Sequence, residues 1–139
     1  MNILVIDAQG GGLGKQVITA LKKNFPDMDI TAVGTNTMAT GVMLKAGASH
    51  AATGENAVVV GCRKADIIIG PLAIVIADSM FGEITPAMAL AVAQSNAKRI
   101  LIPFNHCDNI VVGIHDYNVT ALIQEAIDEV TKTLTSRQP

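Results

Sequence analysis

Hydrophobic and polar positions follow two patterns that alternate along the chain. Short, largely apolar runs occur at residues 3–6, 29–33, 50–52, 66–70 and 99–104, and such runs are typical of strands buried in a parallel sheet. Apolar residues recur at helical spacing over residues 14–24, 37–46, 56–64, 86–95 and 118–135. This alternation predicts one three-layer α/β domain over residues 1–139, with a mostly parallel sheet of five or six strands.

Two segments fit this alternation less simply. A sixth apolar run, residues 110–114, follows the fifth predicted strand after residues 105–109. That connection is too short for a parallel crossover, so the pattern predicts an antiparallel C-terminal hairpin.

The segment 72–83 has an apolar first half that periodicity leaves open as a strand or a short helix. We expect this segment to cover a ligand crevice or to pack on a partner subunit.

The first predicted strand runs directly into a glycine-rich turn and then into the first helix. A helix N-terminus presents unpaired backbone N–H groups and the positive end of the helix dipole, and its usual occupant is a phosphate or carboxylate. The alternative is a glycine turn that merely lets this helix lie close to the strand. We predict a phosphate-binding loop, stiffened by hydrogen bonds from loop N–H groups to its aspartate, that consists of Asp7, Gly10, Gly11, Gly12, Gly14 and Lys15.

Three known nucleotide-binding patterns match this loop to different degrees. The P-loop pattern fails at Gln9 and Gln16, and the third glycine of the dinucleotide pattern G-x-G-x-x-G would fall on Lys15. Gly12 and Gly14 fit the last two glycines of the pattern T-G-x-x-x-G-x-G. The loop therefore resembles that of short-chain dehydrogenases, and the resemblance implies a Rossmann-like domain.

Three further positions are predicted to contact a ligand. Open α/β sheets bind ligands in the crevice beyond the carboxyl ends of their strands, and Asn36, Gly70 and Asn105 follow or end predicted strands. Asn36 has the polar groups to bind ribose hydroxyls, but we favour the alternative that Thr35, Asn36 or Thr37 caps the next helix.

Candidates for proton transfer or covalent chemistry are few. His106 is a candidate proton donor at the crevice, and its alternative is a turn histidine in solvent. Cys107 is a weaker candidate nucleophile, and Asp78 is a candidate acid or base whose alternative is an exposed loop carboxylate. The expected hairpin would separate His106 from His115 by about 15 Å, so no metal site is predicted.

Composition narrows the class of protein. The chain has 139 residues, half of them hydrophobic, with a mean hydropathy of +0.41, which suits a buried parallel sheet and a homo-oligomer. A net charge of -2, three Phe, one Tyr and no Trp argue against a nucleic-acid partner. No apolar run is long enough to span a membrane and the start lacks a basic region, so we expect a cytoplasmic location.

Three stretches are shared with a known family. They are residues 6–16, 76–86 and 102–109, and together they resemble a family of short bacterial proteins known only as a domain of unknown function. The resemblance covers nearly the whole chain and implies no activity.

The resulting hypothesis is a protein that binds a nucleotide or another phosphorylated small molecule, including an NAD(P)-like one, as a non-catalytic ligand-binding or regulatory homo-oligomer. The alternative is a small nucleotide- or dinucleotide-dependent enzyme that uses His106 or Asp78 for proton transfer. The Tyr-x-x-x-Lys signature of short-chain dehydrogenases is absent, because Ala121 stands four residues after Tyr117.

Overall fold

A parallel β-sheet forms the centre of the fold. The computed structural model describes residues 1–103, 108–115 and 118–136. The five strands are β1 (Ile3–Asp7), β2 (Ile30–Gly34), β3 (His50–Thr53), β4 (Ile67–Pro71) and β5 (Lys98–Ile102), arranged in the order β3-β2-β1-β4-β5. Every neighbouring pair is parallel, which confirms the predicted α/β class.

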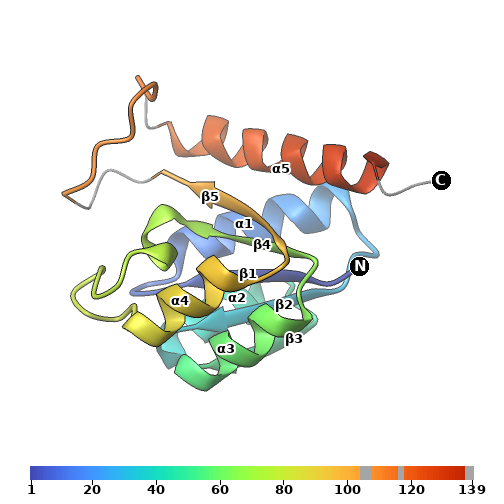
Figure 1. Ribbon diagram of the computed structural model, residues 1–139. Helices are drawn as coiled ribbons and strands as arrows, with labels where there is room; N and C mark the ends of the chain where they lie inside the picture. The colour runs from blue at the N-terminus through green and yellow to red at the C-terminus, as the bar shows by residue number, and fades with distance from the viewer. Residues whose placement is uncertain (104–107, 116–117, 137–139) are drawn as a thin grey trace.

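Helices cover both faces of the sheet (Figure 1). One layer contains α1 (Gly12–Asn24), α2 (Thr37–Lys45) and α5 (Val119–Ser136), and the other contains α3 (Glu55–Lys64), α4 (Pro86–Gln94) and the short 3-10 helix η1 (Leu72–Val75). Alternate residues of β1 point into the two layers, because Ile3 and Val5 join one buried cluster whereas Leu4 and Ile6 join the other. Burial on both faces explains why the central strands are continuous apolar runs.

The strand order creates a crevice beside β1. The chain proceeds from β1 outward to β2 and β3, and then crosses back to β4 and β5 on the other side of β1. The connections after β1 and β4 therefore leave in opposite directions, through α1 on one face and η1 on the other. In open α/β sheets a ligand crevice lies at such a switch point.

Capping residues begin two helices where the sequence predicts them. The Asn36 side chain caps α2 by accepting a hydrogen bond from the Ala39 N–H at 2.9 Å. Thr85 caps α4 by accepting from the Met88 N–H at 3.2 Å, and Pro86 occupies the first helical position.

The predicted antiparallel hairpin is wrong. Residues 110–114 form no strand, and Val112 and Gly113 lie in a turn with Gly113 at φ 96°. Ile110 and Val112 are 90% and 94% exposed, so this apolar run lacks the buried face that would hold it against a neighbouring strand. Without a hairpin, nothing in the structure sets the expected separation between His106 and His115. His106 itself lies outside the described residues.

The segment after β4 is neither a strand nor an α-helix. It forms η1 and then a loop over residues 76–84.

Among the helices of the described ranges, none combines the length and the apolar character needed to cross a membrane.

Candidate functional site

A cavity of about 810 Å³ lies at the carboxyl ends of β1 and β4. The glycine-rich loop, residues 8–13, lines one side. Pro71 at the end of β4, Ala73 of η1 and residues 76–81 line the other, and Asp108 and Asn109 complete the wall. This is the switch point of the sheet, and residues 76–81 line the cavity there.

The four glycines of the loop fall into two classes. Gly11 has φ 74°, and a Cβ there would lie 2.8 Å from the Ala39 Cα. A Cβ at Gly14 would lie 3.0 Å from the Asp7 Cβ. Gly10 and Gly12 have no positive φ, and a Cβ at either would meet nothing within 4 Å. The fold therefore requires glycine at Gly11 and Gly14 but not at the two glycines that face open space.

Asp7 holds the loop in place, as the sequence predicts. Its carboxylate is 3% exposed and accepts hydrogen bonds from the Ala8 N–H at 2.8 Å and the Gly14 N–H at 2.7 Å. Burial raises the pKa of Asp7, although these two hydrogen bonds oppose the shift, and the nearby Glu83 charge raises it further.

Several backbone donors of the loop have no hydrogen-bond acceptor among the described residues. The Gly11 N–H donates to the Ala8 carbonyl at 3.0 Å. Within the described parts of the chain, the structure assigns no acceptor to the N–H groups of Gly10, Gly12 and Leu13. These groups belong to residues that line the cavity at the start of α1, where the helix dipole favours negative charge.

Glu83 ties the loop over residues 76–84 to the residues that follow β1 and β2. One carboxylate oxygen, Oε1, accepts hydrogen bonds from the Gln9 N–H at 2.9 Å, the Thr35 hydroxyl at 2.7 Å and the Asn36 side-chain amide at 2.8 Å. Partial burial disfavours the charged form, but these three donors outweigh it and lower the pKa of Glu83. Nothing in the local sequence pattern around Glu83 points to partners 47 and 74 residues away.

The loop that carries Glu83 has an unusual backbone. Asp78, Met80 and Phe81 lie in the left-handed region at φ 64°, 56° and 57°, which is costly for residues other than glycine. The Asp78 N–H donates to the Ile84 carbonyl, and the Ser79 hydroxyl donates to the Ala73 carbonyl, both at 2.7 Å. These contacts and Glu83 hold the loop in a conformation that its own backbone disfavours.

The charged side chains that line the cavity are acidic. Asp7, Asp78 and Asp108 line it, and no Lys, Arg or His occurs among the described lining residues. Lys15 is exposed on α1 and is not among the lining residues. Backbone N–H groups therefore supply the attraction for an anion, and the three carboxylates oppose it.

Two further predicted ligand contacts, Gly70 and Asn36, have structural roles. Gly70 is buried in β4, and a Cβ there would lie 2.6 Å from the Ile6 carbonyl oxygen, so this glycine serves close strand packing. Asn36 is occupied by its cap and by Glu83, and neither residue lines the cavity. Asn105, His106 and Cys107 lie outside the described residues. Of the predicted site residues, the structure thus brings Asp7, Gly10, Gly11, Gly12 and Asp78 together around the cavity, and Gly14 and Lys15 do not line it.

A family model matches residues 2–135 of the chain. The chain belongs to the DUF3842 family, a domain of unknown function. The fold of this DUF3842 protein is similar to that of a dodecameric FMN-dependent UbiX-like decarboxylase from Escherichia coli O157:H7, with a TM-score of 0.49, 14% identity and 94% of each chain covered. The search of curated proteins finds no match.

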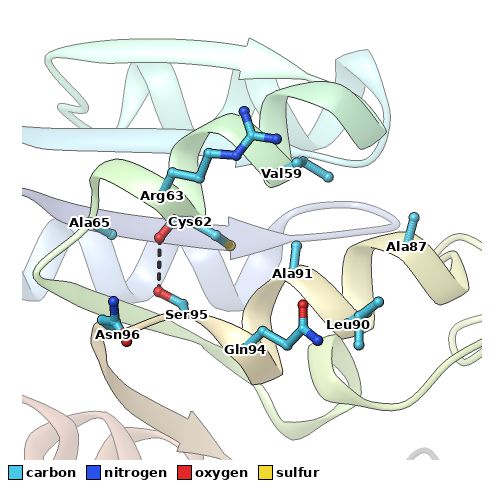
Figure 2. A pocket seen from close by; sticks show the side chains of 10 residues that line it. All are labelled: Val59, Cys62, Arg63, Ala65, Ala87, Leu90, Ala91, Gln94, Ser95 and Asn96. Atoms are coloured by element: carbon cyan, nitrogen blue, oxygen red, sulfur yellow. Dashed lines mark hydrogen bonds between the residues drawn. The ribbon is translucent and has the colours of Figure 1, made fainter.

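The DUF3842 chain has a second hollow between α3 and α4, of about 510 Å³ (Figure 2). The Ser95 hydroxyl there donates to the Cys62 carbonyl at 2.8 Å, and burial raises the pKa of the Cys62 thiol to about 11. Ala65 and Asn96 place this hollow near the amino ends of β4 and β5, away from the switch point. A neutral, buried thiol is not a nucleophile.

No group of three or more His, Cys, Asp or Glu side chains suited to a metal ion occurs within residues 1–103, 108–115 and 118–136. His50, at the start of β3, lies 3.5 Å from the Asp29 carboxylate on the exposed surface.

Proposed function

We propose that this DUF3842 protein binds a nucleotide or another phosphorylated small molecule in the cavity at the carboxyl ends of β1 and β4. The phosphate contacts the N–H groups of Gly10, Gly12 and Leu13. One observation carries the proposal: Gly10 and Gly12 have neither a positive φ nor a close neighbour. Glycine in the first turn of a helix lowers helix stability, and a bare backbone there lets a ligand approach.

The other lining residues determine which chemical groups the bound molecule carries besides its phosphate. Leu13, Pro71, Ala73 and Ile76 give it an apolar wall, which suits a base or another flat ring. Asp78 and Asp108 also line it, and they accept hydrogen bonds from hydroxyl or amino groups of the ligand. Because these carboxylates repel a phosphate, Mg²⁺ that screens the phosphate charge strengthens binding.

The protein acts as a ligand-binding or regulatory subunit of a homo-oligomer. Both oxygens of the Asp7 carboxylate are engaged by backbone N–H groups, so Asp7 supports the loop. A second candidate is an enzyme that uses Asp78 for proton transfer, which is favoured by the position of Asp78 on the cavity wall. Chromatography that monitors the loss of a nucleotide from solution, with the native protein and with Asp78→Asn, separates the two candidates.

Thermal unfolding against a panel of phosphorylated ligands tests the proposed function. The panel contains AMP, ATP, GTP, FMN, coenzyme A and sugar phosphates, each with and without Mg²⁺. A ligand at 100 times its Kd adds about 2.7 kcal/mol to the free energy of unfolding, which raises Tm by several degrees.

The matched variants are Gly12→Leu and Gly41→Leu. Both positions have open space around the new Cβ, but Gly41 lies on the exposed side of α2 and does not line the cavity. We expect Gly12→Leu to abolish the ligand-induced shift and Gly41→Leu to retain it. A panel that shifts nothing, or equal shifts in both variants, contradicts the proposed function.

A further inference from the structure

The protein's own Glu83 occupies the carboxyl end of β2. In a dinucleotide-binding α/β domain, the ligand crosses the switch point and an acidic residue after the second strand holds the ribose of one half. In this protein, Thr35 and Asn36 follow β2, and the carboxylate at that place comes from the loop over residues 76–84.

The polar side-chain groups at this end of β2 are already paired. The Thr35 hydroxyl donates to Glu83. The Asn36 amide group donates both to Glu83 and to the Gln9 carbonyl, at 2.8 and 3.0 Å, while its oxygen accepts from the Ala39 N–H. A ribose placed here would have to replace hydrogen bonds that the protein makes to itself.

The open space lies on the other side of β1. Residues 34–36 and Glu83 do not line the cavity, whereas Pro71 at the end of β4 and Ala73 in η1 do. A phosphate on the Gly10 and Gly12 N–H groups therefore has room for one attached group, toward β4.

We infer that the site accepts mononucleotides and excludes dinucleotides, and that Glu83 is the residue that determines this specificity. The inference rests on the proposed function and narrows its ligand class to single-nucleotide phosphates. A dinucleotide reaches the end of β2 only if the loop over residues 76–84 is displaced, which breaks the three hydrogen bonds to Glu83. Charge-assisted hydrogen bonds of this kind are stronger than neutral ones.

Calorimetric titration with matched ligand pairs tests the inference. AMP is compared with NAD, and FMN with FAD, because each dinucleotide contains its mononucleotide plus a second nucleotide. We expect the native protein to bind the mononucleotide of at least one pair at least about tenfold more tightly than the dinucleotide, a difference of about 1.4 kcal/mol.

Three variants assign the effect to Glu83. Glu83→Ala removes the acceptor, and we expect the remaining preference to be less than threefold, which corresponds to about 0.7 kcal/mol or less. Glu83→Gln keeps an acceptor oxygen of the same shape, so the exclusion persists. Glu125→Ala removes an exposed carboxylate on α5 and controls for net charge. Circular dichroism verifies that each variant folds.

The outcomes separate the two proposals. Equal or tighter dinucleotide binding by the native protein overturns the inference and leaves the proposed function standing. An undiminished preference in a folded Glu83→Ala variant overturns the assignment to Glu83. If neither member of either pair binds, this inference fails. The proposed function fails with it only if the whole thermal-unfolding panel also shifts nothing.

Discussion

Neighbouring glycines in the loop after β1 have different roles. Gly11 needs a left-handed backbone and lies against Ala39 of α2. Gly12, the next residue, begins α1 and is open to the cavity. A sequence motif treats the two as equivalent, but the fold depends on the first and the proposed ligand on the second.

We predict that alanine has different effects on the free energy of unfolding at these two positions. Gly11→Ala lowers the free energy of unfolding by about 2–4 kcal/mol, because it combines a left-handed alanine with a backbone clash. Gly12→Ala leaves it unchanged or raises it by at most about 1 kcal/mol. Urea unfolding of both variants without ligand is the measurement. If Gly12→Ala is as unstable as Gly11→Ala, the fold itself requires Gly12 and the main support for the proposed function is lost.

Among the elements, the loop over residues 76–84 depends most on distant contacts. The left-handed backbone of three of its residues disfavours the observed conformation, and the hydrogen bonds of Glu83 to residues that follow β1 and β2 offset that cost. Because Glu83 accepts these bonds as a carboxylate, the anchoring of the loop depends on pH.

The pH dependence has a defined sign. The pKa of Glu83 is lowered in the folded protein from its usual value of 4.5, so its stabilising effect is complete above that pH and is lost as the pH falls through the folded pKa. We expect the native protein to be more stable than Glu83→Gln at pH 7, and the difference to shrink below pH 4.5.

Chemical unfolding of both proteins at several pH values measures this difference. Asp7 is present in both proteins and its pKa is raised mainly by burial, so the comparison reports chiefly on Glu83. A difference that stays constant from pH 7 to pH 3 would show that the Glu83 carboxylate does not anchor the loop through its charge.

On the scale of the whole molecule, exposed apolar side chains gather around the cavity. Phe81 is fully exposed, and Ile110 and Val112 are exposed by 90% or more. Phe81 itself lines the cavity, as do Asp108 and Asn109 next to Ile110, and Figure 1 shows both segments at the end of the sheet to which β5 points. Large exposed apolar groups in one region are typical of an interface.

We therefore predict a homo-oligomer. Light scattering after size-exclusion chromatography should give a multiple of the 14.5 kDa chain mass. Phe81→Ser should shift the equilibrium toward smaller species. Met38→Ser, at an exposed apolar residue on α2, should have no effect. A single 14.5 kDa species at micromolar concentration contradicts the prediction.

The sequence by itself determined the α/β class, the mostly parallel sheet, the junction between β1 and α1, and the starts of α2 and α4, although it left Thr35, Asn36 and Thr37 open as the cap of α2. These features depend on local periodicity and on hydrogen bonds within a few residues, so they are visible in a short window of sequence. The tertiary structure alone decided the strand order, the loss of the hairpin, the separate roles of Gly11 and Gly12, and the position of Glu83. Glu83 contacts Gln9 across 74 residues, and whether residues that far apart meet depends on how the sheet and its covering helices pack, which no local pattern encodes.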